Sequence, residues 1–267
     1  MKLNLTVFTF FLLFTYQSNS YEIPRSKLRV SAIDWCPQIC PSSKNKPGYV
    51  VEIMQLLLRK SDLSLHIDIY PWSRAIKYVT QGNYSALLSP AKKEAPSLIY
   101  PRVPIGIQKM CFFTLADSTW RYKGSESLKG ISIGVADGTS LEELSEYHHQ
   151  NQHQFQSQPY HERFLIQNIK KLVKGRIDTF IFSRNTTLLE TNNMTDPFPI
   201  RMANCVSDAP IYVAFTSNKK FSKIINQVIQ RFDTEMLNTI TQREVEFILA
   251  KYDVGFKVQD LLFHQKM

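Results

Sequence analysis

The first hundred residues combine hydrophobic patterns of two periods, one typical of strands and one typical of helices. Strand-like stretches cover residues 28–33, 65–70 and 84–88. Apolar residues recur at helical spacing over 49–59, and a short helix is predicted over 73–80. This alternation of three strands with two helices predicts a parallel sheet in an α/β lobe.

A similar order of elements follows residue 104. Strands are predicted over 110–114, 131–135, 177–182 and 211–215, and helices over 140–149, 162–173, 221–237 and 242–251. Ligands of open α/β sheets gather at the carboxyl ends of the strands. We therefore expect a site in the loops that follow Ile33, Tyr70, Leu88, Val135 and Phe182.

The N-terminus has the form of a secretory signal peptide. An apolar stretch runs from Val7 to Phe14, and small residues stand three and one positions before Tyr21. We predict a signal peptide over residues 1–20, cleaved after Ser20. The apolar stretch is shorter than the roughly 20 residues that span a bilayer, so we expect a secreted product.

The composition is that of a globular protein with a basic net charge. The chain has 267 residues, of which 43% are hydrophobic, and disordered and fibrous classes are excluded. Its formal net charge is +9, and removal of Lys2 with the signal peptide leaves +8. Such a charge suits an anionic partner or simply keeps the protein soluble. No surface that interleaves basic and aromatic residues is evident, so we expect no nucleic-acid partner.

Four cysteines in a secreted chain are consistent with two disulfides. Three pairings are possible, and we favour the local pair Cys36–Cys40 together with the distant pair Cys111–Cys205. The alternative is a metal site, but the chain lacks the paired C-x2-C spacing of zinc sites. We predict no metal and no cofactor.

Several short motifs, in this order, resemble bacterial periplasmic solute-binding proteins of the polar amino acid-binding type. They lie at 48–53, at 71–82 with Pro71, Trp72, Arg74 and Gly82, at 128–140, at 172–178 and at 209–215. The resemblance implies an α/β fold of the type II, periplasmic binding protein-like class. Each of two lobes would hold a mainly parallel sheet flanked by helices, with two crossing segments as the hinge.

The resemblance also implies the division into lobes. Residues 21–107 with 216–267 would form a discontinuous first lobe, and residues 108–215 a second. It further implies a periplasmic location.

The chain departs from this family at both expected ligand anchors. An arginine shortly after the third strand usually grips the ligand carboxylate there, but the stretch 89–96 contains none. An acidic residue typically binds the α-ammonium group, but Ser183 and Arg184 stand at that place. We therefore expect a ligand other than a standard amino acid, such as a small anion, a modified amino acid or a peptide.

Ten residues near the expected strand ends are candidate ligand contacts: Trp35, Glu52, Trp72, Arg74, Ser89, Lys92, Thr139, Ser140, Ser183 and Arg184. The tryptophans would stack on a ligand, or lie in the core. Thr139 or Ser140 would cap a helix and form an anion seat, or be a plain cap. Lys92 or Lys93 would supply a point charge without the bidentate geometry, and Arg184 would replace the missing clamp. Glu52 would contact a ligand cation, or lie on a solvated helical face. Arg74 would face the cleft, or form a surface salt bridge.

The leading hypothesis for function is a monomeric binding protein that captures a small polar solute and presents it to an ABC permease or a membrane sensor. The other hypothesis is a dehydratase-like enzyme on the same scaffold. An enzyme would need a positioned acid or base in the cleft, such as Glu52 or a histidine. No catalytic motif is present in the sequence, so we predict that the chain is not an enzyme.

Overall fold

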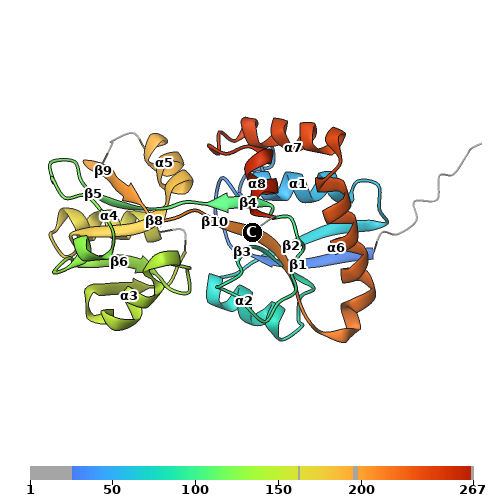
Figure 1. The fold of residues 1–267 in the computed structure, drawn as a ribbon, viewed down its shortest axis with the longest axis horizontal. Coiled ribbons are helices and arrows are strands. Elements are labelled where there is room, and N and C mark those ends of the chain that lie inside the picture. The colour runs from blue at the N-terminus through green and yellow to red at the C-terminus, as the bar shows by residue number, and fades with distance from the viewer. Residues whose placement is uncertain (1–25, 162, 195–197, 266–267) are drawn as a thin grey trace, which may run out of the picture.

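The computed structural model describes residues 26–161, 163–194 and 198–265. The signal peptide predicted for residues 1–20, with its cleavage after Ser20, lies outside these ranges. Within them, no helix combines the length and the hydropathy that crossing a membrane requires. The described chain forms two sheets with their flanking helices, which lie side by side as two lobes in Figure 1.

The first lobe is built on a five-stranded sheet in the order β2-β1-β3-β10-β4. Its strands are β1 (Ser26–Ala32), β2 (Leu63–Ile69), β3 (Ala86–Ala91), β4 (Gly106–Gln108) and β10 (Ala209–Phe215). The helices of this lobe are α1 (Tyr49–Leu58), α2 (Trp72–Thr80), α6 (Ser222–Met236), α7 (Thr239–Lys251) and α8 (Val258–His264).

The second lobe repeats the arrangement with the order β7-β6-β8-β5-β9. Its strands are β5 (Met110–Leu115), β6 (Ile133–Ala136), β7 (Phe155–Gln158), β8 (Thr179–Ser183) and β9 (Ile200–Cys205). Its helices are α3 (Ser145–Gln150), α4 (Phe164–Val173) and α5 (Arg184–Asn192).

The two-lobed α/β class with a mainly parallel sheet in each lobe is confirmed, and each sheet contains one strand that runs against the other four. In the first sheet β1 is parallel to β2 and β3, whereas β10 is antiparallel to β3 and β4. In the second, β6 is parallel to β7 and β8, whereas β5 is antiparallel to β8 and β9. The antiparallel pairs arise because strands next to the crossings, β10 and β5, return through each sheet.

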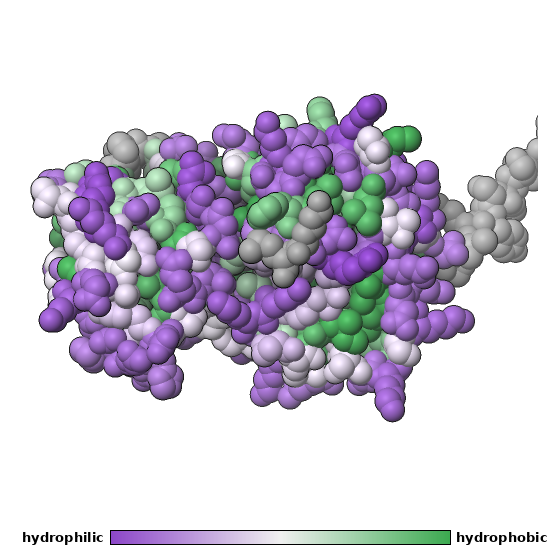
Figure 2. All heavy atoms as spheres, viewed as in Figure 1, coloured by the Kyte–Doolittle hydropathy of each residue, from purple (hydrophilic) through white to green (hydrophobic). Residues whose placement is uncertain are grey.

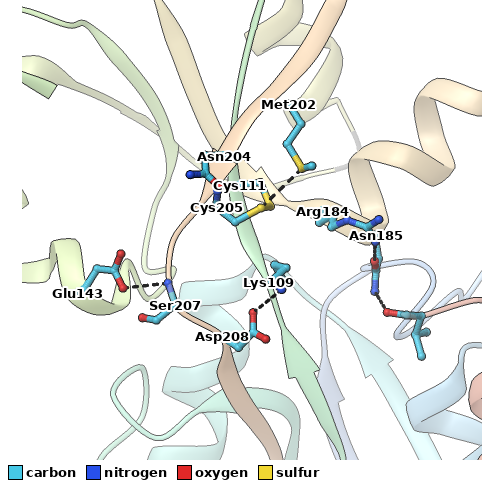
Figure 3. A network of polar contacts seen from close by, with 11 residues as sticks. Lys109, Cys111, Glu143, Arg184, Asn185, Met202, Asn204, Cys205, Ser207 and Asp208 are labelled. Carbon is cyan, nitrogen blue, oxygen red and sulfur yellow. Dashed lines mark hydrogen bonds and ion pairs between the residues drawn. A yellow bond between two sulfur atoms is a disulfide. The ribbon is translucent and has the colours of Figure 1, made fainter. Parts of the chain in front are cut away.

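The chain crosses between the lobes twice, after β4 and before β10. The two crossings are tied together by an ion pair of 3.1 Å between Lys109 Nζ and Asp208 Oδ1, which Figure 3 shows. Pairing places β10 in the first sheet, although the predicted boundary at residue 215 assigns it to the second lobe. We propose that the lobes divide at these crossings.

Both favoured disulfides are confirmed. Cys111–Cys205 joins directly opposite residues of β5 and β9, 94 positions apart in the chain, beside the crossings (Figure 3). Cys36–Cys40 closes the loop after β1. That loop packs against Gly48, the residue before α1, which has a φ of +111°. Any side chain at position 48 would bring its Cβ to within 2.2 Å of the carbonyl oxygen of Gln38. Only glycine allows this approach.

Each lobe is stabilised by a hydrophobic core of its own. The apolar face of α1 is fully buried in the first lobe, with Tyr49, Ile53 and Met54 at 0% exposure. In the second lobe, Phe112 and Phe180 are equally buried. Hydrophilic residues cover most of the face in Figure 2, and hydrophobic residues form separate patches on it.

One predicted helix has other bounds in the structure, and several observed elements were not predicted. The helix predicted over 140–149 is a 3₁₀ turn at Glu142–Leu144 followed by α3. Five strands and helices were not predicted, namely β4, β7, α5, β9 and α8. The polar sequence of α5 lacks a clear apolar stripe, which explains why its helical character escaped the periodicity.

Candidate functional site

A small cavity lies where the two lobes meet, at the carboxyl ends of the strands. Its volume is about 20 Å³, which is room for about one water molecule. The residues that line it come from both lobes: Ile33, Trp35, Trp72, Glu94, Met110, Thr139, Tyr160 and Phe182. Most of them follow or end a strand, as the rule for open α/β sheets leads us to expect.

Trp35 is held by the disulfide loop after β1. Its backbone N–H donates to the carbonyl of Ile39 at 2.9 Å, and the N–H of Ile39 donates back to Trp35 at 2.9 Å. The Cys36–Cys40 bond closes this short ladder. The Trp35 ring is 5% exposed, and its indole N–H has no hydrogen-bond partner.

Trp72 begins α2 and forms a second wall of the cavity. It is 4% exposed and, like Trp35, has an indole N–H without a well-aligned hydrogen bond. Trp72 also faces an outer hollow of about 550 Å³, which Arg74, Asp137 and Tyr160 line as well. Arg74 is exposed in this hollow, outside the central cavity.

Glu94 places a carboxylate in the cavity three residues past β3. Its Oε2 accepts the backbone N–H of Ala91 at 2.8 Å, and its Oε1 accepts the backbone N–H of Ser140 at 2.8 Å. The second bond crosses between the lobes. Burial raises the pKa of Glu94 to about 7, against the lowering effect of these two N–H groups and of the nearby Trp72 indole.

Tyr160 belongs to the second lobe but packs against the cores of both. Its ring contacts Phe164 and Phe182, with centroids 5.6 and 5.2 Å away, and also the core cluster that holds Trp35 and Trp72. Its hydroxyl donates to the carbonyl oxygen of Asp34 at 3.0 Å. Burial raises its pKa well above 10.0, and the charges of Glu190 and Asp34 raise it further.

Further polar contacts hold the lobes closed. Lys93 Nζ lies 3.3 Å from Glu142 Oε2, and the Asn185 amide donates to the carbonyl oxygen of Val254 at 2.9 Å. With the Glu94 and Tyr160 bonds, these contacts join the first lobe to the second on several sides of the cavity. The structure therefore represents a closed form.

The structure brings three of the ten candidate residues into the cavity, namely Trp35, Trp72 and Thr139. Ser140 lies in an adjoining hollow of about 330 Å³, where Lys93 and His148 are also found. Thr139 and Ser140 are not the N-cap residues of a helix, but the Ser140 hydroxyl accepts the backbone N–H of Glu142 at 3.3 Å, where the 3₁₀ turn begins. Thr139 donates to the Ala136 carbonyl, and the Ser140 hydroxyl donates to Glu142.

The other candidates lie outside the lining of these cavities. Glu52 accepts from Lys251 Nζ and the Tyr252 hydroxyl, both at 2.6 Å, and so joins α1 to α7 and the residue after it. Lys92 lies over the Tyr212 ring, 4.7 Å from its centroid. Ser89 is fully buried with φ of +67°.

Ser183 and Arg184 stand at the start of α5. The Ser183 hydroxyl accepts from Thr186 within the helix, and the Arg184 guanidinium donates to Asn185. Neither side chain lines the central cavity.

Sequence reasoning missed Glu94, Tyr160 and Met110. Glu94 lies in the stretch 89–96, where the family resemblance predicts a cationic side chain rather than an anionic one. Tyr160 carries no motif, and its place in the cavity depends on the closure of the lobes.

A larger hollow, of about 670 Å³, lies on the first lobe away from the cavity. Four basic residues line it, Lys60, Lys220, Lys223 and Arg231. This hollow is open to solvent. It does not lie at the carboxyl ends of the strands, where the ligands of such sheets gather.

Comparison with known proteins identifies the fold. No family model and no curated protein sequence matches the chain. Solved structures do match along nearly their whole length. A histidine kinase sensor domain described as similar to periplasmic binding proteins has a TM-score of 0.68 and 16% identity, over 86% of this chain and 96% of that one.

Two further structures have the same fold. The arginine-, lysine- and histidine-binding protein ArtJ of Geobacillus stearothermophilus has a TM-score of 0.66 and 15% identity, covering 87% of this chain and 96% of its own. The ancestral amino acid-binding protein AncCDT-1, a precursor of cyclohexadienyl dehydratase, has a TM-score of 0.63 and 14% identity, covering 85% of this chain and 94% of its own. The chain thus has the two-lobed fold of the periplasmic amino-acid-binding proteins.

Proposed function

We propose that this protein is a periplasmic solute-binding protein whose two lobes close over a small polar solute. The observation that carries the proposal is the cavity at the strand ends of both sheets, with residues of each lobe in its lining. Two crossings joined at Lys109 and Asp208 would act as the hinge. Recognition by closure needs no covalent chemistry.

The partner would be a membrane protein that distinguishes the closed form from the open one. Both an importer and a sensor fit, because the matching structures include ABC-type binding proteins and a histidine kinase sensor domain. We further propose that the mature chain works as a monomer, since the cavity is complete within one chain.

Thermal unfolding of the mature chain against a panel of amino acids, amines, organic acids and small peptides tests the proposal. A solute that binds only the folded state raises the free energy of unfolding by about 2.7 kcal/mol at a hundred times its Kd. We expect at least one such solute to raise the melting temperature and to change the scattering profile of the chain. Failure of every class in the panel would contradict a solute-binding role.

A second candidate function is a dehydratase-like enzyme, and Glu94 is the observation that favours it. A buried carboxyl group with a pKa of about 7 in a cavity suits general acid or base work near neutral pH. Product analysis of the same mixtures separates the two functions. Turnover that is abolished in Glu94→Gln would replace binding with catalysis as the function.

A further inference from the structure

We propose that the solute is a small organic cation that carries a hydrogen-bond acceptor, with Glu94 as its counter-charge and aromatic rings as its walls. This inference rests on the proposed function and names the ligand class of the same cavity. It reverses the sign that the net charge of the chain suggested.

The charge of the cavity comes from Glu94. Of the described residues that line it, Glu94 is the only one with a charged side chain. Each carboxylate oxygen accepts one backbone N–H, from Ala91 and from Ser140, which leaves about half of the acceptor sites of the group open. A buried carboxylate with spare acceptor capacity is stabilised by a cation and repels an anion.

The walls of the cavity suit the same ligand class. Four aromatic residues line it, Trp35, Trp72, Tyr160 and Phe182. Aromatic faces attract ammonium groups, and the attraction is strongest where water is excluded. Rings around a single carboxylate therefore form a site for an organic cation.

The two indole N–H groups indicate the acceptor. Trp35 and Trp72 are both more than nine-tenths buried. The Trp35 indole nitrogen has no hydrogen-bond partner, and the Trp72 indole lies near Glu94 without a well-aligned bond. Buried donors are normally satisfied. A hydroxyl or carbonyl oxygen on the ligand would accept from them.

Acidic and basic side chains both surround the cavity, with Lys93 and Arg74 in the adjoining hollows. Asp34 from the first lobe and Glu190 from the second both act on Tyr160 and raise its pKa. Nearby lysines have other partners: Lys93 pairs with Glu142, and Lys92 lies over Tyr212.

Entry of a ligand requires the lobes to separate. The cavity of about 20 Å³ is too small for any organic cation. Opening would lengthen the bond from the Ser140 N–H to Glu94, and the lobes would then close again with the cation beside the carboxylate. Hollows on both sides, lined by Ser140 and by Arg74, adjoin the cavity.

Calorimetric titration of the mature chain with matched pairs of compounds tests the charge. The first pair is choline and its neutral carbon isostere 3,3-dimethyl-1-butanol, and the second is 4-amino-1-butanol in its ammonium form and 1-pentanol. We expect a cation to bind about tenfold or more tightly than its neutral partner, which corresponds to one moderately strong charge interaction. Equal affinity within both pairs, or no binding of either cation, would overturn the inference.

Variants of Glu94 separate charge from shape. Glu94→Gln keeps the size of the side chain and should remove the preference for the cation, whereas Glu94→Asp keeps the charge and should retain part of it. Glu126→Gln makes the same charge change at an exposed position and should leave the preference unchanged. Melting of the unliganded variants shows that each one folds.

The outcomes distinguish this inference from the function on which it rests. Binding of an anion or a neutral solute that is unaffected or strengthened in Glu94→Gln would contradict the cationic ligand and leave the solute-binding role intact. Failure of every solute in the wider panel would remove both.

Discussion

At the scale of single residues, two carboxyl groups have ionisation coupled to the closed form. Glu94 and Glu190 each have a pKa raised to about 7, first by burial, with the charge of Asp34 adding to the effect on Glu190. Glu94 faces Glu142 across the lobes and lies near Tyr100 and the Trp72 indole. The closed, folded chain therefore binds protons at these two sites more readily than the unfolded chain.

The sign of the pH dependence follows from these shifts. Both groups are protonated in folded and unfolded chains below about 4.5, so the stability linked to them is fully present there and is lost as pH rises through 7. We expect the melting temperature of Glu94→Gln to fall less between pH 5 and pH 8 than that of the unmodified chain. The double variant with Glu190→Gln should fall less again, and parallel profiles for all three proteins would contradict the assignment.

At the scale of elements, the two disulfides do different work. Cys111–Cys205 closes a loop of 94 residues between neighbouring strands of the second sheet. Cys36–Cys40 closes a loop of four residues and shapes the turn that carries Trp35. A cross-link constrains the unfolded chain more when its loop is longer.

We therefore expect unequal losses on removal of the two bonds. The chain-entropy model gives about 4 to 5 kcal/mol of stability for the long loop and about 2 kcal/mol for the short one. Urea unfolding of C111A/C205A and of C36A/C40A measures both, each variant serving as the control for the other. The short-loop variant should lose ligand affinity out of proportion to its stability, because Trp35 loses its support. A larger loss of stability in C36A/C40A than in C111A/C205A would contradict this account.

At the scale of the whole molecule, the closed form depends on a few hydrogen bonds between the lobes. The Tyr160 hydroxyl donates to Asp34, and the Asn185 amide donates to Val254. Each bond contributes about 1 kcal/mol net. These two bonds together therefore contribute about 2 kcal/mol to the stability of the closed form.

Loss of both bonds should favour the open form. In the variant Y160F/N185A, about 2 kcal/mol of lost bonding would raise the ratio of open to closed molecules by about thirtyfold. Small-angle scattering should show a larger radius of gyration. Thr191→Ala is the matched control, because that hydroxyl donates within α5 to the carbonyl of Thr187. A double variant that scatters like the control at every temperature below unfolding would contradict the role of these bonds.

Local pattern was enough to predict much of the fold. In α1 the apolar residues recur at helical spacing on the buried face, and β8 is a short apolar run that is buried along its whole length. The even number of cysteines and their spacing led to both disulfides. The order of the motifs led to two lobes, since each motif is a turn or a strand end with its own local chemistry.

The candidate site was predicted less well, and the reason is physical. The tryptophans were found because they stand directly after strands, where position along the chain and position in space agree. Glu94 and Ser140 meet across 46 residues, and the donor is a backbone N–H that any residue would supply. Tyr160 reaches both cores only when the lobes close.

The sequence by itself therefore determined most of the elements and the cross-links, which depend on local periodicity and spacing, and the order of its motifs implied the two-lobed plan by resemblance. Only the tertiary structure decided the charge of the cavity. A net charge of +9 sums over the whole surface, whereas the cavity is governed by one carboxylate that closure removes from water. Of the ligand classes that the sequence left open, this difference between surface and cavity favours a cation over an anion.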